Sequence, residues 1–209
     1  MLANASHELR SPLTRIRMGL ELLRHQPGST AVDEISRNIH ELDQLIDEIL
    51  LASRLDASPD DLGPLEHVDL VGLAAEECAR TGADFETLAG VTSVQVMGQT
   101  RLLRRLLRNL LENARRHGGG ESGLTLTQQG DWVELRVTDH GPGVPPAMRE
   151  RIFEPFFRLP GASEREGGVG LGLALVRTIA QRHGGQVQCA DNPGGGACFV
   201  VRLPRAPSI

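Results

Sequence analysis

Residues 101–117 read RLLRRLLRNLLENARRH and carry the strongest pattern in the 209-residue chain. Leucines recur at spacings of three and four, which predicts a helix that buries one apolar face. The segment 101–116 also holds six arginines and one glutamate, and this basic excess favours a polyphosphate nearby. An ordinary amphipathic helix with a solvated basic face explains the same pattern equally well.

Within this segment, Asn109 and Asn113 lie four residues apart, so both carboxamides project from one face of the helix. A side-chain amide oxygen suits a hard cation such as Mg²⁺, which takes few protein ligands and keeps water and phosphate oxygens around it. The pair is therefore a candidate metal site.

The segments around this helix predict an α/β sandwich with helices on one face of a mixed sheet. A Gly130–Asp131 turn joins two alternating stretches, which indicates a β-hairpin. An irregular glycine-rich region spans roughly 140–168. We expect helices at 70–81 and about 170–183, and strands at 84–89, 92–97, 124–129, 132–138, 185–190 and 197–203.

Residues 1–55 read as two helices with a heptad-like apolar seam, joined by a short turn at 25–30 that makes them antiparallel. Two helices alone cannot enclose a core, so a second copy would complete a four-helix bundle. The alternative is a hairpin packed on the rest of its own chain. The predicted class is α+β, with a hairpin at 1–56, a linker at 57–67 and the sandwich at 68–205.

Composition excludes several classes of function. All 22 basic residues are arginine and tyrosine is absent, which rules out a phosphate-loop lysine, a Schiff-base lysine and a tyrosine nucleophile. Aromatic residues make up 3% and the net charge is −5, so we expect no nucleic-acid partner. Three cysteines without C-x-x-C spacing, and no apolar run near the ~20 residues that span a bilayer, predict a cytoplasmic location.

The N-terminal helix carries His7-Glu8-Leu9-Arg10-Ser11-Pro12. His7 falls beside the apolar stripe, so we expect its imidazole to face solvent, where most histidines have no function. Glu8 supplies an adjacent carboxylate that can orient the ring or accept its proton. Pro12 removes the hydrogen bond to the Glu8 carbonyl at a cost of ~3 kcal/mol, which loosens the helix beside His7.

Two glycine-rich motifs follow in the C-terminal half. Asp139-His140-Gly141-Pro142-Gly143 comes directly after a predicted strand, and an acceptor there suits recognition of a base amino group, although turns use the same residues. The run 167–173, GGVGLGL, opens a predicted helix whose free N–H groups favour an anion. No strand leads directly into it, so it is not the dinucleotide fingerprint.

Five motifs in this order resemble the sensor histidine kinases of two-component systems over essentially the whole chain. They are H-E-L-R-x-P-L-T at 7–14, N-x-x-x-N-A at 109–114, D-x-G-x-G at 139–143, F-E-P-F-F-R at 153–158 and G-x-G-L-G-L at 168–173. The resemblance implies a dimerisation and phosphotransfer hairpin followed by an ATP-binding domain related to those of gyrase and heat-shock chaperone ATPases.

The resemblance also implies roles for single residues. His7 is the expected phosphoacceptor, Glu8 its acid/base partner, and Ser11 stands where a family threonine serves hydrolysis of the phosphorylated partner. Asn113 is the expected Mg²⁺ ligand, supported by Asn109. Residues 153 to about 166 are expected to form a lid. Nucleotide binding is assigned to Asn109, Asn113, Arg116, His117, Asp139, Gly141, Gly143, Phe156, Arg158, Gly168, Gly170, Leu171 and Gly172.

One position distinguishes this chain from the related gyrase and chaperone ATPases. The related ATPases carry a water-activating glutamate four residues before the metal-binding asparagine, where this chain has Asn109, and Glu112 points ~100° away around the helix. The resemblance therefore implies that the γ-phosphoryl group of ATP is transferred to His7 with the help of Mg²⁺. Alternatives are a nucleotide-binding dimeric scaffold without phosphotransfer, a gyrase-like ATPase and a phosphatase-dominant member.

The expected partners are a second copy of the chain and the receiver domain of a response regulator. The resemblance further implies a longer parent protein, anchored in a membrane through an N-terminal part that precedes His7.

Overall fold

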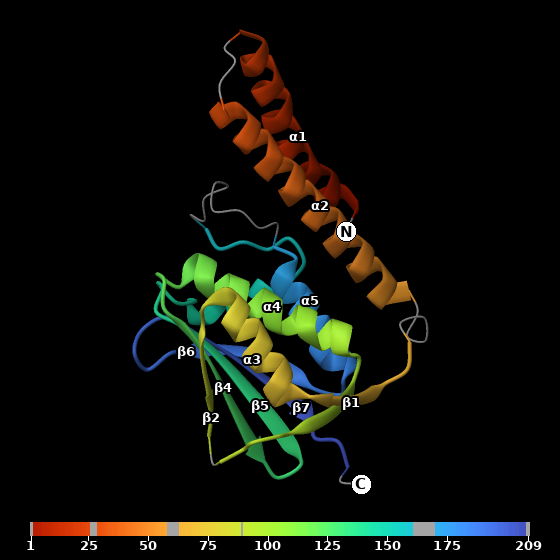
Figure 1. Cartoon of the computed structure of the whole chain (residues 1–209), viewed down its shortest axis with the longest axis vertical. Helices are drawn as coiled ribbons and strands as arrows, with labels where there is room; N and C mark the ends of the chain where they lie inside the picture. Colours follow the sequence, from red (N-terminus) through yellow and green to blue (C-terminus); the bar gives the residue numbers. More distant parts are fainter. Residues whose placement is uncertain (1, 26–28, 58–62, 89, 161–169, 208–209) are drawn as a thin grey trace.

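The computed structural model describes residues 2–25, 29–57, 63–88, 90–160 and 170–207, without the side chains of residues 2–8, 22, 24–25, 29–31 and 56–57. These residues form a helical hairpin followed by an α/β sandwich, so the predicted α+β class is confirmed (Figure 1). Within this described part, no helix is both long enough and apolar enough to cross a membrane.

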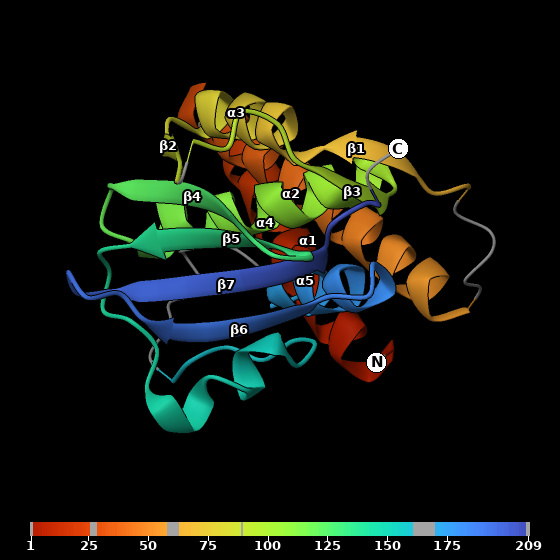
Figure 2. The same ribbon diagram turned by 90° about the horizontal axis from the view of Figure 1, so that it is seen from below.

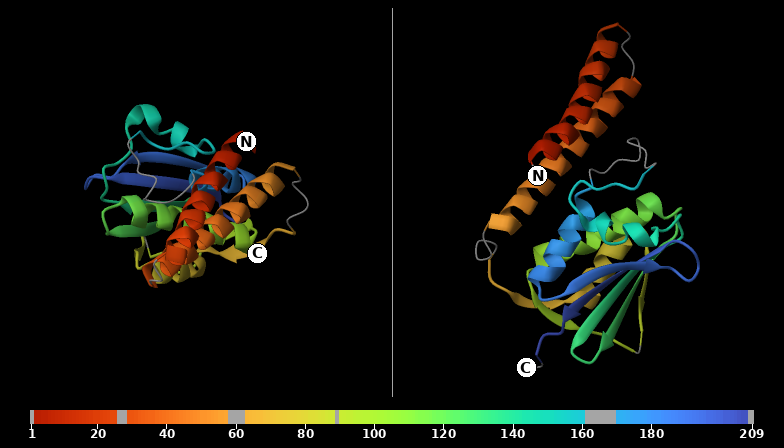
Figure 3. Two further views of the ribbon diagram at one scale, coloured as in Figure 1. Left: turned by 90° about the horizontal axis from the view of Figure 1, so that it is seen from above. Right: turned by 180° about the vertical axis from the view of Figure 1, so that it is seen from behind.

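The hairpin consists of α1 (Leu2–His25) and α2 (Ser29–Ala57), which lie side by side and project from the sandwich (Figure 3). Pro12 lies inside α1 and is buried, and Leu45 of α2 is 2% exposed. An ion pair of 2.9 Å between Arg15 Nη2 and Glu41 Oε2 joins the two helices. The hairpin nevertheless leaves large apolar side chains in solvent, namely Leu13, Met18, Leu20, Val32, Ile39, Ile46 and Leu50.

The sandwich contains a five-stranded sheet of order β2-β4-β5-β7-β6, in which only the β2–β4 pair is parallel. The mixed sheet is therefore confirmed. Its strands are β2 (Asp84–Thr87), β4 (Ser122–Gln129), β5 (Trp132–Asp139), β6 (Gln186–Asp191) and β7 (Ala197–Pro204).

Three helices cover one face of this sheet, as predicted (Figure 2). They are α3 (Leu70–Thr81), α4 (Thr100–His117) and α5 (Gly172–Arg182). The leucine face of α4 is the centre of the core, because its six leucines are at most 4% exposed. They pack with inward-facing side chains of the sheet and of α5, among them Leu124, Leu126, Leu135, Val137, Leu175, Ile179, Phe199 and Val201.

A second, two-stranded sheet departs from the expectations. β1 (Glu66–Asp69) begins inside the predicted linker and pairs antiparallel with β3 (Gln95–Gly98). The sequence predicts a strand at 92–97 but no partner for it. Each strand has four residues, and the apolar pair Val68 and Val96 faces the core. So short a strand shows no alternation that a sequence pattern can detect. The irregular region holds two short 3₁₀ helices, η1 (Pro146–Met148) and η2 (Arg151–Phe153).

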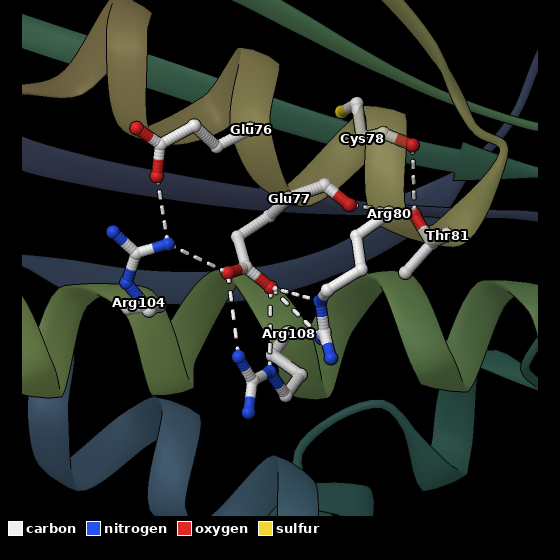
Figure 4. A network of polar contacts seen from close by, with 7 residues as sticks. All are labelled: Glu76, Glu77, Cys78, Arg80, Thr81, Arg104 and Arg108. Atoms are coloured by element: carbon white, nitrogen blue, oxygen red, sulfur yellow. Dashed lines mark hydrogen bonds and ion pairs between the residues drawn. The ribbon is translucent and has the colours of Figure 1, made fainter.

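A buried carboxylate locks α4 against α3 (Figure 4). Glu77 is 1% exposed and forms ion pairs with Arg80 at 2.9 Å, Arg104 at 3.0 Å and Arg108 at 3.3 Å. Burial alone raises the pKa of this carboxyl, but hydrogen bonds from Arg108 and Arg104 outweigh it, so the pKa is lowered. The network fixes the rotation of α4, the helix that carries both asparagines.

A buried imidazole connects the start of α4 with the end of α5. His183 Nε2 accepts a hydrogen bond from the Gln99 N–H at 3.1 Å, and Nδ1 donates to the Ile179 carbonyl at 2.7 Å. Burial lowers the pKa of His183 because the charged imidazolium loses its hydration. The neutral ring is thus the form that this structure needs.

Candidate functional site

Asp139 ends β5 and is the buried acceptor of the candidate site. Alternation along β5 turns Val133, Leu135 and Val137 toward the helices, and the same alternation turns Asp139 inward, where it is 3% exposed. Its Oδ1 accepts the N–H groups of Gly141 and Ala197, both at 3.0 Å. Among the described residues nothing donates a hydrogen bond to Oδ2, so this oxygen keeps its capacity to accept one from a ligand.

Main chain packs directly on Asp139 from two other elements. A Cβ at Gly118, at the end of α4, would lie 2.5 Å from the Asp139 Cβ, and one at Gly196 would lie 2.0 Å from the Asp139 carbonyl oxygen. A Cβ at Gly141 would lie 2.0 Å from the His117 carbonyl oxygen, and Gly143 has φ +73°. Gly141 is thus required for close packing at the C-terminal end of α4, and Gly143, where a Cβ would lie 3.1 Å from the Gly196 carbonyl oxygen, for close packing on the β6–β7 loop.

Asn109 of α4 contacts the end of the glycine-rich run 167–173, at the start of α5. Asn109 is 7% exposed, and its Nδ2 donates to the Gly172 carbonyl at 3.1 Å. Asn113, one turn further along α4, is half-buried, and its side chain makes no hydrogen bond within the described part of the chain. The carboxamide of Asn113 therefore fits a divalent cation, whereas the amino group of Asn109 holds α4 to α5.

These contacts bring three motifs together along α4. Asn109 contacts Gly172 at the start of α5, and eight residues later His117 packs on Gly141. Eight residues span about 12 Å of helix. The buried acceptor Asp139 thus lies at the C-terminal end of α4, and the N-terminus of α5 lies beside the middle of α4.

The segment 153–158 is anchored by aromatic contacts. Phe153 is buried edge-on against Phe199, with ring centroids 6.4 Å apart, and the Arg177 guanidinium lies 4.5 Å from the Phe153 ring centre. Arg151 lies 4.4 Å from the centre of the Phe157 ring. These contacts hold the segment against α5 and the sheet.

Phe156 and Gly170 bring the two flanks of residues 161–169 together. Phe156 has φ +65°, and its N–H donates to the Gly170 carbonyl at 2.9 Å. Gly170 has φ +74°, and a Cβ there would lie 2.8 Å from the Phe157 carbonyl oxygen. The candidate Gly168, and the expected lid beyond residue 160, lie outside the described residues.

The remaining candidates lie around this frame. Arg116 and His117 are exposed at the C-terminal end of α4, and Arg158 is half-buried. Leu171 is 1% exposed and its carbonyl accepts the Leu175 N–H at 2.9 Å, so it packs in the core at the first turn of α5.

The hairpin candidates lie on α1. His7 and Glu8 belong to this helix, and their side chains fall outside the description. Ser11 is half-buried. The Arg15–Glu41 contact gives the pairing of the antiparallel helices, and eight residues further along each of them His7 comes opposite Ile49 of α2.

An ion pair connects that level of the hairpin with α4. Glu48 Oε1 lies 3.0 Å from Arg105 Nη2, and Leu55 of α2 is buried in the core of the sandwich. Burial raises the pKa of Glu48, Arg105 lowers it in part, and the nearby Glu112 raises it further. The hairpin thus contacts the sandwich at α4, the helix that carries both asparagines.

Sequence reasoning missed several of these residues. Gly118 and Gly196 belong to the glycine clusters at 118–120 and 194–196, which were the available signal. Ala197 acts through its backbone, and Glu48 and Arg105 lie 57 residues apart, so no local pattern identifies them.

Two family models match the chain. Residues 98–207 match the histidine kinase-, DNA gyrase B- and HSP90-like ATPase model, and residues 1–58 match the His kinase A (phospho-acceptor) domain model. The first match covers most of the sandwich, and the second covers the hairpin that precedes it.

Known proteins are similar over nearly the whole chain. The signal transduction histidine-protein kinase/phosphatase MprB of Mycobacterium avium is 35% identical, with 99% of this chain and 43% of that protein aligned. The sensor histidine kinase CpxA of Escherichia coli is 35% identical, with 98% and 46% aligned. The crystal structure of full-length ShkA in complex with AMPPNP has a TM-score of 0.68 and 28% identity, covering 99% of this chain and 46% of that one. The chain thus spans less than half the length of these relatives.

Proposed function

Because this chain belongs to the histidine kinase-, DNA gyrase B- and HSP90-like ATPase family, we propose that it binds ATP in the sandwich and transfers the γ-phosphoryl group to His7. The observation that carries the proposal is Asp139. A buried carboxylate with one oxygen saturated by backbone N–H groups and the other left to accept fits the exocyclic amino group of adenine.

The phosphate chain would run from Asp139 along α4 toward the start of α5. Backbone N–H groups in the first turn of α5 have no side-chain cap within the described residues, and the helix dipole favours anionic phosphates there. Arg116, exposed at the end of α4, is the proposed cationic partner of the phosphates. Arg158 is proposed as a second one.

Asn113 would hold Mg²⁺ through its carboxamide oxygen, with Asn109 fixing the helix face beside it. Within the described residues no group of three or more His, Cys, Asp or Glu side chains is placed to hold a metal, which fits a cation whose remaining ligands are water and phosphate. When bound, Mg²⁺ neutralises charge that develops on the phosphate oxygens during transfer.

In the transfer step, an imidazole nitrogen of His7 forms a bond to the γ-phosphorus, and the bond from that phosphorus to the bridging oxygen breaks to leave ADP. Glu8 accepts the imidazole proton. Asn109 cannot accept a proton from water, so the site offers His7 as nucleophile rather than hydrolysis. Positioning of the hairpin against the sandwich supplies most of the rate.

The proposed partners follow from the hairpin. Its exposed apolar side chains would be covered by a second copy, which gives a homodimeric four-helix bundle. Phosphohistidine would then pass its phosphoryl group to an aspartate of a response-regulator receiver domain. Ser11 keeps the hydroxyl proposed for dephosphorylation of that partner. We further propose that the chain is the cytoplasmic core of a longer membrane-anchored sensor.

The experiment is incubation with γ-labelled ATP and Mg²⁺, followed by treatment of the labelled chain with acid and with alkali. We expect label that acid removes and alkali leaves, and none in the His7→Gln variant. Asp139→Asn should fold and keep His7 but lose most of the label, since the proposed base contact is weakened. Acid-stable label, or label that survives His7→Gln, would contradict the proposal.

A further inference from the structure

The β6–β7 loop, residues 192–196, packs on the carboxylate that is proposed to read the base. Asn192 Nδ2 donates to the Asp139 carbonyl oxygen at 2.9 Å, and the Ala197 N–H donates to Asp139 Oδ1 at 3.0 Å. The loop is closed by its own backbone, with Asn192 N–H bonded to the Gly196 carbonyl at 3.2 Å and Gly195 N–H to the Asn192 carbonyl at 2.8 Å. The loop therefore contacts Asp139 as a rigid turn.

Asn192 is the side chain that makes this contact specific. The N–H groups that bind Oδ1 come from the main chain, which any residue type except proline supplies. In the described part of the chain, the carboxamide of Asn192 is the one side-chain group that hydrogen-bonds to Asp139. A donor is needed at this position, because an acceptor would face the Asp139 carbonyl oxygen.

The loop is held from outside as well. Arg149 Nε donates to the Val144 carbonyl at 3.1 Å, and its Nη2 forms an ion pair with Asp191, the residue before Asn192. Arg149 thus ties the segment after the D-x-G-x-G motif to the end of β6. With Gly196 too close to Asp139 for any side chain, the loop has little room to shift.

This arrangement decides where Asp139 Oδ2 points. Oδ1 is fixed by two N–H groups, and the carbonyl of the same residue is fixed by Asn192, so both ends of the residue are constrained. Loss of the Asn192 hydrogen bond would let the end of β5 relax and would rotate Oδ2 away from the base. This rotation would lower the affinity only for nucleotides whose base carries an amino group facing Oδ2.

We propose that Asn192 is a positioning residue that sets the base selectivity of the nucleotide site through Asp139. The inference rests on the proposed function, since it takes Asp139 as the group that reads the adenine amino group. It assigns a role in ligand discrimination to a loop that lies 53 residues from Asp139 in sequence.

The test compares equilibrium binding of ADP and of purine riboside 5′-diphosphate, which lacks the 6-amino group, to the full chain in Mg²⁺ buffer. In Asn192→Asp, which keeps the shape but removes the donor, we expect the preference for ADP to fall about tenfold, with little change in affinity for the analogue. Asn38→Asp is the matched control. It removes a carboxamide hydrogen bond of 2.6 Å to the Glu34 carbonyl on the hairpin and should leave the preference unchanged.

Two kinds of result would overturn the inference. An unchanged preference in a folded Asn192→Asp, or an equal loss of affinity for both nucleotides, would overturn the positioning role. If the unmutated chain itself shows no preference for ADP, the reading of the base by Asp139 fails, and the inference falls with it. If Asn192→Asp does not fold, Asn192→Ala, which removes the donor without adding a charge, gives the same comparison.

Discussion

The hairpin and the sandwich use leucine patterns of equal regularity in opposite ways. In α4 the leucines are at most 4% exposed, whereas in the hairpin Leu13 is 53%, Leu20 is 52% and Leu50 is 48% exposed. A sheet and two further helices close over α4. Apart from the end of α2, where Leu55 enters the core of the sandwich, α1 and α2 pack mainly on each other. The difference teaches that periodicity identifies a buried face without saying whether the chain itself or a second copy buries it.

The largest expected effect is on the free energy of unfolding, when a leucine is removed from α4 or from the hairpin. Leu107→Ala in α4 should lower the free energy of unfolding by about 3 kcal/mol, because a fully buried side chain is replaced by a cavity. Leu20→Ala on the hairpin should change it by less than about 0.5 kcal/mol in the monomer but weaken self-association. Urea unfolding and sedimentation at several concentrations measure both quantities.

Equal destabilisation by the two substitutions, with self-association untouched in Leu20→Ala, would show that the hairpin stripe is not an interface. The comparison between the regions would then be wrong.

Next in size is the lock between α3 and α4. Glu77→Gln should cost about 2 kcal/mol in unfolding free energy, since a buried charge loses its bonds to three arginines. Glu76→Gln is the matched control, because Glu76 is 63% exposed and its carboxylate pairs with Arg104 alone among the residues that the structure describes. It should cost under about 0.5 kcal/mol. Chemical denaturation at neutral pH measures both, and similar costs would refute the lock.

A smaller effect is the pH dependence from His183. The pKa of His183 in the folded chain lies below the ordinary 6.5. As the pH falls below 6.5, the imidazole therefore binds a proton in the unfolded chain before it does so in the folded chain. Stability should therefore decline on acidification through this window, by about 1.4 kcal/mol for each unit of pKa difference. His183→Gln should flatten that part of the stability profile, and an unchanged slope from pH 7 to pH 5.5 would contradict the assignment.

The smallest expected effect concerns the ion pair between Glu48 of the hairpin and Arg105 of the sandwich. A double-mutant cycle with Glu48→Gln and Arg105→Gln should give a coupling of under about 1 kcal/mol, because the desolvation of Glu48 offsets most of the attraction. Since the pKa of Glu48 is raised, protonation near or just above its ordinary 4.5 should favour docking of the hairpin on the sandwich. A coupling of several kcal/mol would mean that the hairpin and the sandwich act as one rigid unit.

Much of the fold follows from sequence because strong periodicity coincides with burial. The leucines of 101–117 and the alternation in 132–138 give α4 and β5 to within a residue. β1 is not predicted, because a four-residue strand with one buried side chain shows no alternation. Its partner β3 is distant in sequence: the paired residues Asp69 and Gln95 lie 26 residues apart, and Glu66 and Gly98 lie 32 apart.

The site follows the same division. Asp139, Asn109 and the motif glycines stand out as local patterns, and the structure brings them to one face of α4. Asn192 and Glu48 carry no such signal, because their roles come from contacts across 53 and 57 residues of chain. Contacts of this kind depend on tertiary packing, which periodicity does not specify.

The most direct test of the account measures ADP formed against phosphohistidine formed over many minutes, in the unmutated chain and in His7→Gln. Because Asn109 cannot act as a base for water, ADP should rise only to the level of phosphohistidine in the unmutated chain and stay at background in the variant. Steady release of ADP that survives His7→Gln would show that the sandwich hydrolyses ATP by itself, and the account of transfer to the hairpin would be contradicted.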